Sequence, residues 1–179
     1  GIGMTDRVAT LAWNDHRHLE AYYGVSGMGA VVHTINPRLF PEQLIYIINH
    51  AEDRILLTDP MFLPLIEKII DNCPKLEKIV AMCTAENLPE SSLDIIAYED
   101  FIGGFDGNYA WPEFEETAAS SLCYTSGTTG NPKGALYTHR STVLHALMAG
   151  TPAVTGTGSN ATLMPVVPMF HVNAWGQPY

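Results

Sequence analysis

One glycine-rich stretch decides how this sequence is interpreted: Tyr124-Thr125-Ser126-Gly127-Thr128-Thr129-Gly130-Asn131-Pro132-Lys133-Gly134. Its glycines allow positive φ angles and leave no side chain between the backbone and a ligand. Backbone N–H groups in such a turn form a concavity that binds anions. The serine and threonine hydroxyls add donors, and the lysine adds a movable positive charge. The stretch predicts a phosphate-binding loop, with a flexible Gly/Ser/Thr linker as the alternative.

The loop differs from two common nucleotide-binding patterns. A Walker A loop has a glycine, four residues, and then Gly-Lys-Ser/Thr. Here Gly127 and Gly130 are three positions apart, and Lys133 is followed by Gly134. The dinucleotide fingerprint G-x-G-x-x-G is also absent from the stretch. Apolar segments flank the loop closely on both sides, which favours a structured turn over a linker.

The charge of the chain is unevenly distributed. A length of 179 residues, 46% hydrophobic, is enough for about one domain with a buried core. The net charge of −10 disfavours nucleic acid and anionic membranes as partners. Residues 117–179 contain no Asp or Glu but do contain Lys133 and Arg140. Carboxylates would repel a polyphosphate, so this asymmetry fits an anionic ligand, although chance in an apolar, Gly-rich region explains it too.

Cysteines and termini bear on the cellular compartment. Cys73, Cys83 and Cys123 are far apart and form no C-x-x-C pair or zinc-binding spacing. No apolar run approaches the length of a membrane span, and residues 1–7 lack the features of a signal peptide. We therefore expect reduced, buried thiols in a cytoplasmic protein without a transmembrane segment. The chain does not start with Met, which suggests a processed or excised product.

Strands alternate with helices through the first half of the chain. Apolar runs predict strands at residues 8–12, 30–35, 54–58 and 78–82. Helices are expected at residues 16–25, from Pro41 through Ile48, and at residues 61–72. In the helix at 16–25 we expect Leu19, Tyr22 and Tyr23 on the apolar face, with His16 and His18 solvated at the surface. This alternation predicts an α/β fold with a parallel or mixed sheet flanked by helices.

The second half of the chain has a weaker pattern. A short strand is expected at 94–98, and strands at 121–125 and 135–138 enter and leave the glycine-rich loop. A helix capped by Ser141 and an interrupted strand at 161–168 should follow. We interpret residues 1–83 as a βαβ block, 84–118 as a connection, and 119–179 as a phosphate-loop block of one partial domain.

Three segments together resemble a known superfamily. Residues 124–140 resemble the signature of adenylate-forming enzymes, which include acyl-CoA synthetases, luciferases and nonribosomal adenylation domains. Residues 168–173, Pro-Met-Phe-His-Val-Asn, resemble its second signature, and residues 29–39 resemble an earlier segment that leads into a βαβ unit. Order and spacing agree, so the resemblance covers nearly the whole chain. It implies part of the N-terminal AMP-binding domain of an acetyl-CoA-synthetase-like fold.

Within the superfamily, residues 164–175 look most like medium- and long-chain fatty-acyl-CoA synthetases. Amino-acid adenylation domains carry an Asp directly after the Phe, where this chain has His171. An imidazole is not a fixed anion, so an amino-acid substrate is disfavoured. An aryl-CoA ligase is the nearest alternative within the enzyme class. A non-catalytic nucleotide-binding or interaction module is the alternative outside it.

The resemblance implies a two-step reaction that uses ATP, Mg²⁺ and coenzyme A. A carboxylate attacks the α-phosphorus of ATP to give an acyl-adenylate and pyrophosphate, and the thiol of coenzyme A then displaces AMP. Developing charge on the phosphate oxygens is stabilised by preorganised donors. By resemblance, the residues that bind the ATP phosphates are Thr125, Ser126, Gly127, Thr128, Thr129 and Gly130. Thr128 is also the candidate contact to the metal through Mg·ATP, and no metal ligand set is expected in the chain itself.

Two further roles follow from the resemblance. Lys133 and His171 are the implied catalytic residues: Lys133 would stabilise the loop or the polyphosphate, and His171 would sit between the acyl carboxylate and the phosphate. A plain exposed lysine and a hydrogen-bonded core histidine are the alternatives. Val172, Asn173 and Trp175 are the implied acyl-pocket residues. On a helix, Trp175 would share the face of His171, with core packing as its alternative.

The superfamily also has parts that this sequence lacks. The adenine-binding segment, the acidic residue that helps to hold Mg²⁺, the ribose-binding Asp, and the small C-terminal domain with its catalytic lysine all lie beyond Tyr179 in that pattern. Part of the N-terminal region would precede Gly1. We therefore expect the isolated chain not to catalyse adenylation. A truncated sheet would expose an apolar face or an unpaired edge, which predicts self-association or marginal stability.

Overall fold

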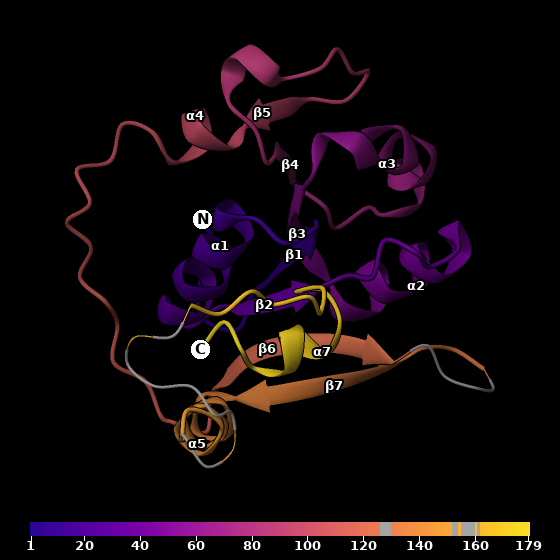
Figure 1. The fold of residues 1–179 in the computed structure, drawn as a ribbon. Helices are drawn as coiled ribbons and strands as arrows, with labels where there is room; N and C mark the ends of the chain where they lie inside the picture. Colours follow the sequence, from indigo (N-terminus) through magenta and orange to yellow (C-terminus); the bar gives the residue numbers. More distant parts are fainter. Residues whose placement is uncertain (126–129, 152–153, 155–159, 161) are drawn as a thin grey trace.

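The computed structural model describes residues 1–125, 130–151, 154, 160 and 162–179. Its centre is a seven-stranded mixed sheet in the order β5-β4-β3-β1-β2-β6-β7 (Figure 1). All neighbouring strands pair in parallel except β6 and β7, which form an antiparallel hairpin. The expected α/β fold with a parallel or mixed sheet is confirmed. The strands are β1 (Arg7–Leu11), β2 (Val31–Thr34), β3 (Asp53–Thr58), β4 (Lys78–Ala81), β5 (Ile95–Ala97), β6 (Ala119–Thr125) and β7 (Lys133–Thr138).

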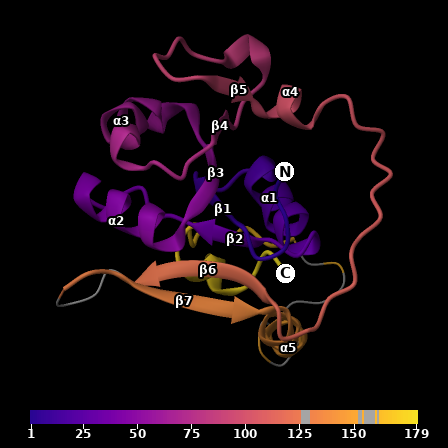
Figure 2. The ribbon, with the colours of Figure 1, turned by 180° about the vertical axis from the view of Figure 1, so that it is seen from behind.

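Helices cover both faces of this sheet (Figures 1 and 2). One face carries α2 and α3, and the other carries α1 and the C-terminal segment. No helix in the described ranges is long and apolar enough to cross a membrane. The helices are α1 (His16–Gly27), α2 (Pro41–Ala51), α3 (Leu63–Ile69), α4 (Tyr98–Ile102), α5 (His139–Ala149) and α7 (Val172–Trp175), with 3₁₀ turns η1 (Pro60–Phe62), η2 (Ile70–Asn72) and η3 (Ala85–Asn87).

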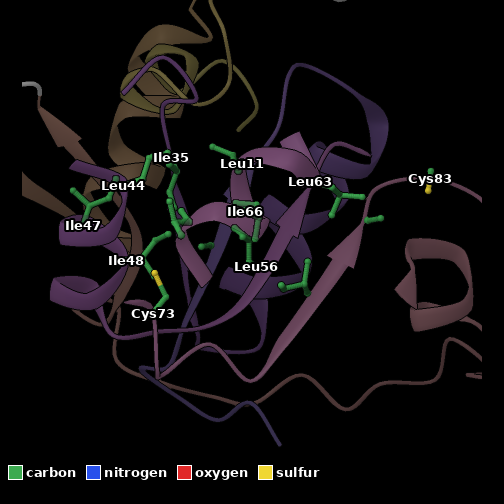
Figure 3. Close-up of a cluster of buried hydrophobic side chains, with 14 residues drawn as sticks. Leu11, Ile35, Leu44, Ile47, Ile48, Leu56, Leu63, Ile66, Cys73 and Cys83 are labelled. Carbon is green, nitrogen blue, oxygen red and sulfur yellow. The ribbon is translucent and has the colours of Figure 1, made fainter. Parts of the chain in front are cut away.

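Alternation along the strands builds a core on each face. Leu11 and Leu56 point to the α2/α3 side, where they meet Leu44, Ile48 and Ile66 (Figure 3). Their neighbours in the strands point to the α1 side and form the second cluster. Each fully buried aliphatic side chain contributes about 1.5–3 kcal/mol relative to leaving it exposed. The two clusters fix the strands whose ends carry the site.

The buried face of α1 differs from the expected one. Leu19 and Tyr23 are largely exposed, and only Tyr22 of the expected apolar face is fully buried. His18, which the sequence placed at the surface, is fully buried, and that prediction is wrong. Its Nδ1 lies 3.0 Å from the carbonyl oxygen of Trp13 and its Nε2 lies 2.9 Å from Oγ1 of Thr10. Because both ring nitrogens have partners, the histidine replaces an apolar side chain in the core.

Two expectations for the second half also need correction. Helix α5 begins at His139 and is capped by Thr138, with Ser141 as the third residue of a reciprocal capping box. Residues 162–168 lie in the described part of the chain and form no strand. Pro165 and Pro168 have no N–H to donate to a sheet ladder, which explains why this apolar run does not pair as a strand.

A long connection, residues 103–118, runs around the outside of the molecule from α4 to β6 (Figures 1 and 2). Most of its side chains are exposed. The ring of Trp111 packs over Gly27 at the end of α1, and the ring of Phe114 lies 4.7 Å from that of His139. The connection thereby links the edge strand β5 with β6, which lies beyond β2 in the same sheet.

Candidate functional site

The segments expected to carry function gather at one edge of the sheet. Strands β1, β2, β3 and β6 run in the same direction, so their carboxyl ends meet at a single edge. Trp13 and Asn14 follow β1 there, Thr34 ends β2, and Thr125 ends β6. In open α/β sheets, ligands bind outside the carboxyl ends of the strands. This edge is therefore the candidate active site.

The glycine-rich loop connects β6 and β7 at this edge. Thr125 pairs with Lys133, and the hydroxyl of Thr125 donates a 3.4 Å hydrogen bond to the carbonyl oxygen of Lys133. The predicted phosphate-binding residues Ser126, Gly127, Thr128 and Thr129 lie outside the described residues. Gly130 has φ of +91°, and a Cβ there would meet no described atom within 4 Å. The backbone conformation, and not crowding, requires glycine at this position.

Near the end of β6, Tyr124 contacts a polar cluster that the sequence did not predict. The hydroxyl of Tyr124 lies 2.7 Å from Nδ1 of His50, and its ring lies 5.1 Å from that of His33. His33 is in turn paired with Asp53, with 2.8 Å between Nδ1 and Oδ2, and both side chains are fully buried. Burial raises the pKa of Asp53 and raises the pKa of Tyr124 to about 12. The end of β6 thus packs, through Tyr124, against the buried pair of His33 and Asp53.

The second signature crosses the same edge. Met169 and Phe170 are buried, and the ring of Phe170 meets that of Trp13 edge to face at 5.4 Å. His171 follows, and its side chain is exposed to solvent. The imidazole thus lies just beyond a buried anchor and is open to a ligand.

Residues Val172–Trp175 wind in the left-handed sense. Their φ angles are +49°, +50°, +48° and +55°, and Gly176 continues at +72°. His171 is an extended residue before this turn, with φ of −102° and ψ of 111°, so the helix on which we expected His171 and Trp175 to share a face is absent from the described residues. Left-handed backbone costs roughly 1–2 kcal/mol per residue for non-glycine residues. Such strain persists only where surrounding contacts hold it.

Asn173 supplies those contacts. Its side chain is buried, and Oδ1 accepts a 3.0 Å hydrogen bond from the hydroxyl of Thr34 in β2. Its Nδ2 donates a 2.9 Å hydrogen bond to Oγ of Ser121 in β6. The left-handed turn is therefore fastened to two adjacent strands, one of which leads into the glycine-rich loop. Both polar atoms of the Asn173 side-chain amide are thus hydrogen-bonded within the protein.

A pocket of about 510 Å³ lies between this turn, β6–β7 and α5. Val172, Asn173 and Trp175 all line it, so the structure brings the three predicted acyl-pocket residues together. The carbonyl oxygen of Trp175 lies 2.8 Å from Nε2 of His145, which connects the turn to α5. The side chain of Trp175 is 62% exposed, which argues against its alternative of simple core packing. Lys133 and His171 are not among the lining residues.

In the part of the chain that the structure describes, no group of three or more His, Cys, Asp or Glu side chains is arranged to hold a metal ion. Lys133 is exposed at the start of β7, and the nearest Asp and Glu positions in sequence precede residue 117. The edge thus offers a cation, hydroxyls and a glycine-containing turn, which is a donor set for an anionic ligand.

Sequence reasoning missed the residues that position the site. Asn14, Thr34 and Ser121 contact the second signature through hydrogen bonds across more than 50 residues of sequence. A polar residue in the turn after a buried strand was the available signal for Asn14, because parallel strands bring such turns to a common edge. Thr34 and Ser121 had no comparable signal, because both lie inside strands.

Comparison with known proteins agrees with this geometry. The family model described as AMP-binding enzyme matches residues 1–179. The chain is 57% identical to a medium-chain-fatty-acid–CoA ligase of Ectopseudomonas oleovorans over 180 residues, covering 100% of this chain and 33% of the relative. It is 56% identical to a 3-methylmercaptopropionyl-CoA ligase of Ruegeria pomeroyi, again covering 100% of this chain and 33% of the relative.

A solved structure shares the fold. The crystal structure of an anthranilate CoA ligase in complex with anthranoyl-AMP superposes with a TM-score of 0.86 at 27% identity, covering 98% of this chain and 34% of that one. The chain thus spans about a third of the length of the relatives that it matches. The family model covers the whole chain, including the glycine-rich loop and the second signature. The protein therefore belongs to the family of AMP-binding enzymes.

Proposed function

We propose that this chain supplies the phosphate loop and part of the acyl pocket of an acid–CoA ligase. The enzyme would activate a carboxylic acid with ATP to an acyl-adenylate and then transfer the acyl group to coenzyme A. One observation carries the proposal: the hairpin that bears the glycine-rich loop and the turn that follows His171 are joined through Ser121 and Asn173. A phosphate site and an acid site held at one sheet edge are what this reaction needs.

In this proposal the loop residues hold the ATP phosphates. Thr125 and Gly130 form the described rim of the loop, and Ser126, Gly127, Thr128 and Thr129 complete it by resemblance. Lys133 faces solvent where the hairpin opens and would offset charge on the polyphosphate. Mg²⁺ would arrive with ATP, since the described residues hold no metal cluster of their own. Donors placed before the reaction stabilise charge that develops on the phosphate oxygens.

His171 acts as a hydrogen-bond donor between the acyl carboxylate and the phosphate of ATP. Its exposed imidazole follows the buried anchor Phe170, so its backbone is fixed while the ring remains open to a ligand. There it would orient the acyl carboxylate toward the phosphate by hydrogen bonding. No covalent intermediate on the protein is required, because positioning supplies most of the rate in this type of chemistry.

A medium- or long-chain fatty acid is the proposed acid. Val172 and Trp175 give the pocket apolar walls, and the relative from Ectopseudomonas oleovorans is named for medium-chain fatty acids. A short thioether acid is a second candidate, because a relative of nearly equal identity is named for 3-methylmercaptopropionyl-CoA. An aromatic acid is less supported, since the solved anthranilate ligase is only 27% identical.

The compartment that we propose is the cytoplasm. Cys73, Cys83 and Cys123 are buried and unpaired, as expected of thiols in a reducing cytoplasm. The partners are small molecules: ATP, the acid and coenzyme A. The net charge of −10 argues against nucleic acid.

A chimera tests the proposal. Residues 1–179 would replace the matching third of the Ectopseudomonas oleovorans ligase, and the product would be assayed with octanoate, palmitate, 3-methylmercaptopropionate and benzoate. We expect CoA thioesters from the fatty acids and a loss of about 100-fold or more in kcat for His171→Ala. Thioester formation from benzoate alone would refute the fatty-acid proposal. A folded chimera that makes no thioester with any acid would refute the ligase function.

A second measurement addresses the chain by itself. We expect the 179-residue protein to show no ATP–pyrophosphate exchange, since it spans only about a third of the length of the ligases that it matches. The chimera described above, assayed in parallel, serves as the positive control. Exchange by the purified chain would overturn this expectation and would mean that residues 1–179 contain a sufficient catalytic centre.

A further inference from the structure

Asn14 makes an unusual set of contacts for an asparagine in a connecting turn. Its Oδ1 accepts a 2.6 Å hydrogen bond from the backbone N–H of Met169. Its Nδ2 donates hydrogen bonds to the carbonyl oxygens of Val167, at 3.1 Å, and Pro165, at 3.3 Å. One side chain thus binds three alternate residues of a segment about 150 positions away in sequence.

These contacts replace a missing strand ladder. Alternate residues of an extended segment present their backbone groups to the same side. Pro165 and Pro168 have no N–H, so the segment cannot pair as a strand along its length. A primary amide carries the same donor and acceptor groups as the backbone and satisfies the segment locally. Asn14 therefore occupies the place that a neighbouring strand would otherwise take.

The turn that carries Asn14 is itself fixed on both sides. The backbone N–H of Trp13 donates a 2.8 Å hydrogen bond to Oδ2 of Asp59, which follows β3. Asp15 caps α1 and forms an ion pair with Arg17, with 3.0 Å between Nη1 and Oδ2. The amide of Asn14 is therefore held in place independently of the segment that it binds.

The backbone held by Asn14 leads directly to His171. Tyr22 donates a hydrogen bond from its hydroxyl to the carbonyl oxygen of Met169, and the ring of Phe170 packs on Trp13. The backbone N–H of His171 then donates a 2.9 Å hydrogen bond to the carbonyl oxygen of Pro168. Within the described residues, the imidazole of His171 has no hydrogen bond, ion pair or ring contact of its own. Its position is therefore set by the backbone on either side of it: the segment held by Asn14 before it and the turn held by Asn173 after it.

We propose that Asn14 is a positioning residue for His171: it clamps residues 165–169 to the carboxyl end of β1 and so fixes where the imidazole stands. The catalytic part of this inference rests on the proposed ligase function, whereas the clamp itself does not. Among the described residues, Asn14 makes no hydrogen bond to the glycine-rich hairpin and does not line the pocket, so its proposed effect is on His171.

Hydrogen exchange on the 179-residue chain tests the clamp without any assay of activity. Asn14→Ala should speed exchange of the Met169 amide roughly tenfold, because its acceptor and two neighbouring anchors are lost. Asn14→Asp keeps the acceptor but sets a carboxylate against two carbonyl oxygens, so an intermediate rate is expected. Asn87→Ala is the matched control, since Asn87 is an exposed asparagine bonded only to Thr84, at 2.9 Å. Unchanged exchange at Met169 in Asn14→Ala would overturn the clamp.

The chimera described above tests the catalytic consequence. Asn14→Ala should lower kcat for acyl-adenylate formation roughly tenfold and leave KM for ATP within about twofold of the parent, because the phosphate loop is mounted on other strands. Asn14→Asp should recover part of kcat. An equal rise in KM for ATP, or an unchanged kcat, would refute the positioning role. If the parent chimera is inactive, the ligase function fails while the exchange measurement still decides the clamp.

Discussion

The hydroxyl of Thr34 donates a 3.0 Å hydrogen bond to Oδ1 of Asn173, joining residues 139 positions apart in the sequence. Thr34 ends β2, and Asn173 lies in the left-handed turn after His171. Both side chains are buried, so the bond forms where water does not compete for its groups. This contact holds a strained backbone against the central strands of the sheet.

Substitutions of Asn173 separate the strain of the turn from its hydrogen bonds. Asn173→Ala should lower the free energy of unfolding by about 2–4 kcal/mol, because two bonds are lost and alanine is strained at φ of +50°. Asn173→Gly loses the same bonds but relieves the strain, so it should be about 1 kcal/mol less destabilising than Asn173→Ala. Urea unfolding measures both. Equal effects of the two variants would show that the left-handed conformation is absent in solution.

The buried His18 predicts a dependence of stability on pH. Burial lowers its pKa to about 4 from the ordinary value of 6.5, so the unfolded chain takes up a proton at a higher pH than the folded chain. The contribution of a neutral His18 is complete above pH 6.5 and is lost as the pH falls toward 4. The loss amounts to roughly 3 kcal/mol over this window.

Urea unfolding at pH 4.5, 5.5 and 7 checks this prediction. His18→Gln should lose clearly less stability than the wild-type protein between pH 7 and 4.5. His16→Gln, at the exposed neighbouring histidine, is the control and should follow the wild-type curve. Parallel curves for His18→Gln and wild type would contradict the buried, neutral imidazole.

Two glycines of α1 should respond oppositely to alanine. A Cβ on Gly24 would meet no described atom within 4 Å, so Gly24→Ala should stabilise the helix by about 0.5–1 kcal/mol. A Cβ on Gly27 would lie 2.7 Å from Cζ3 of Trp111, so Gly27→Ala must displace that ring. We expect Gly27→Ala to shift the tryptophan emission and to give no stabilisation. An unchanged emission spectrum in Gly27→Ala would count against the packing of the connection on α1.

The isolated chain should self-associate through α5 and β7. Leu136, Leu144 and Leu147 are 57–66% exposed on these two adjacent elements, and β7 is an edge strand. Sedimentation at increasing concentration should show oligomers, and Leu144→Glu with Leu147→Glu should shift the protein toward the monomer. Met61→Glu changes an equally exposed apolar residue elsewhere and should leave association unchanged. A monodisperse wild-type monomer would refute the expectation.

The sequence predicted the fold where local pattern and tertiary packing agree. Apolar runs such as residues 55–57 form parallel strands because each residue of the run packs on one face of the sheet or the other. It failed at His18, where two hydrogen-bond partners made a polar side chain acceptable in the core. The hydrophobic periodicity of the sequence carries no information about such hydrogen-bond partners.

The site was predictable only in part for a similar reason. Its motif residues stood out by type and spacing, but the left-handed turn at Val172–Trp175 depends on Thr34 and Ser121, which are distant in the chain. Residues 165, 167 and 169 are likewise hydrogen-bonded to the distant side chain of Asn14. Long-range hydrogen bonds of single side chains leave no periodic signal, so apolar composition alone favoured a strand and a helix there.

The long connection at residues 103–118 gives the molecule a modular construction. It spans from β5 to β6 over the outside of the fold, while the hairpin β6–β7 joins the sheet only through β2. The hairpin and the βαβ layer meet along the pairing of β6 with β2 and through the contacts of Tyr124 with His33 and His50. A cut in the exposed turn around Gly104 would leave two polypeptides with complementary edges, Val32 opposite Ser121 and Thr34 opposite Cys123. The glycine-rich hairpin would then belong to a separate polypeptide, together with the C-terminal segment that packs on the α1 side of the sheet.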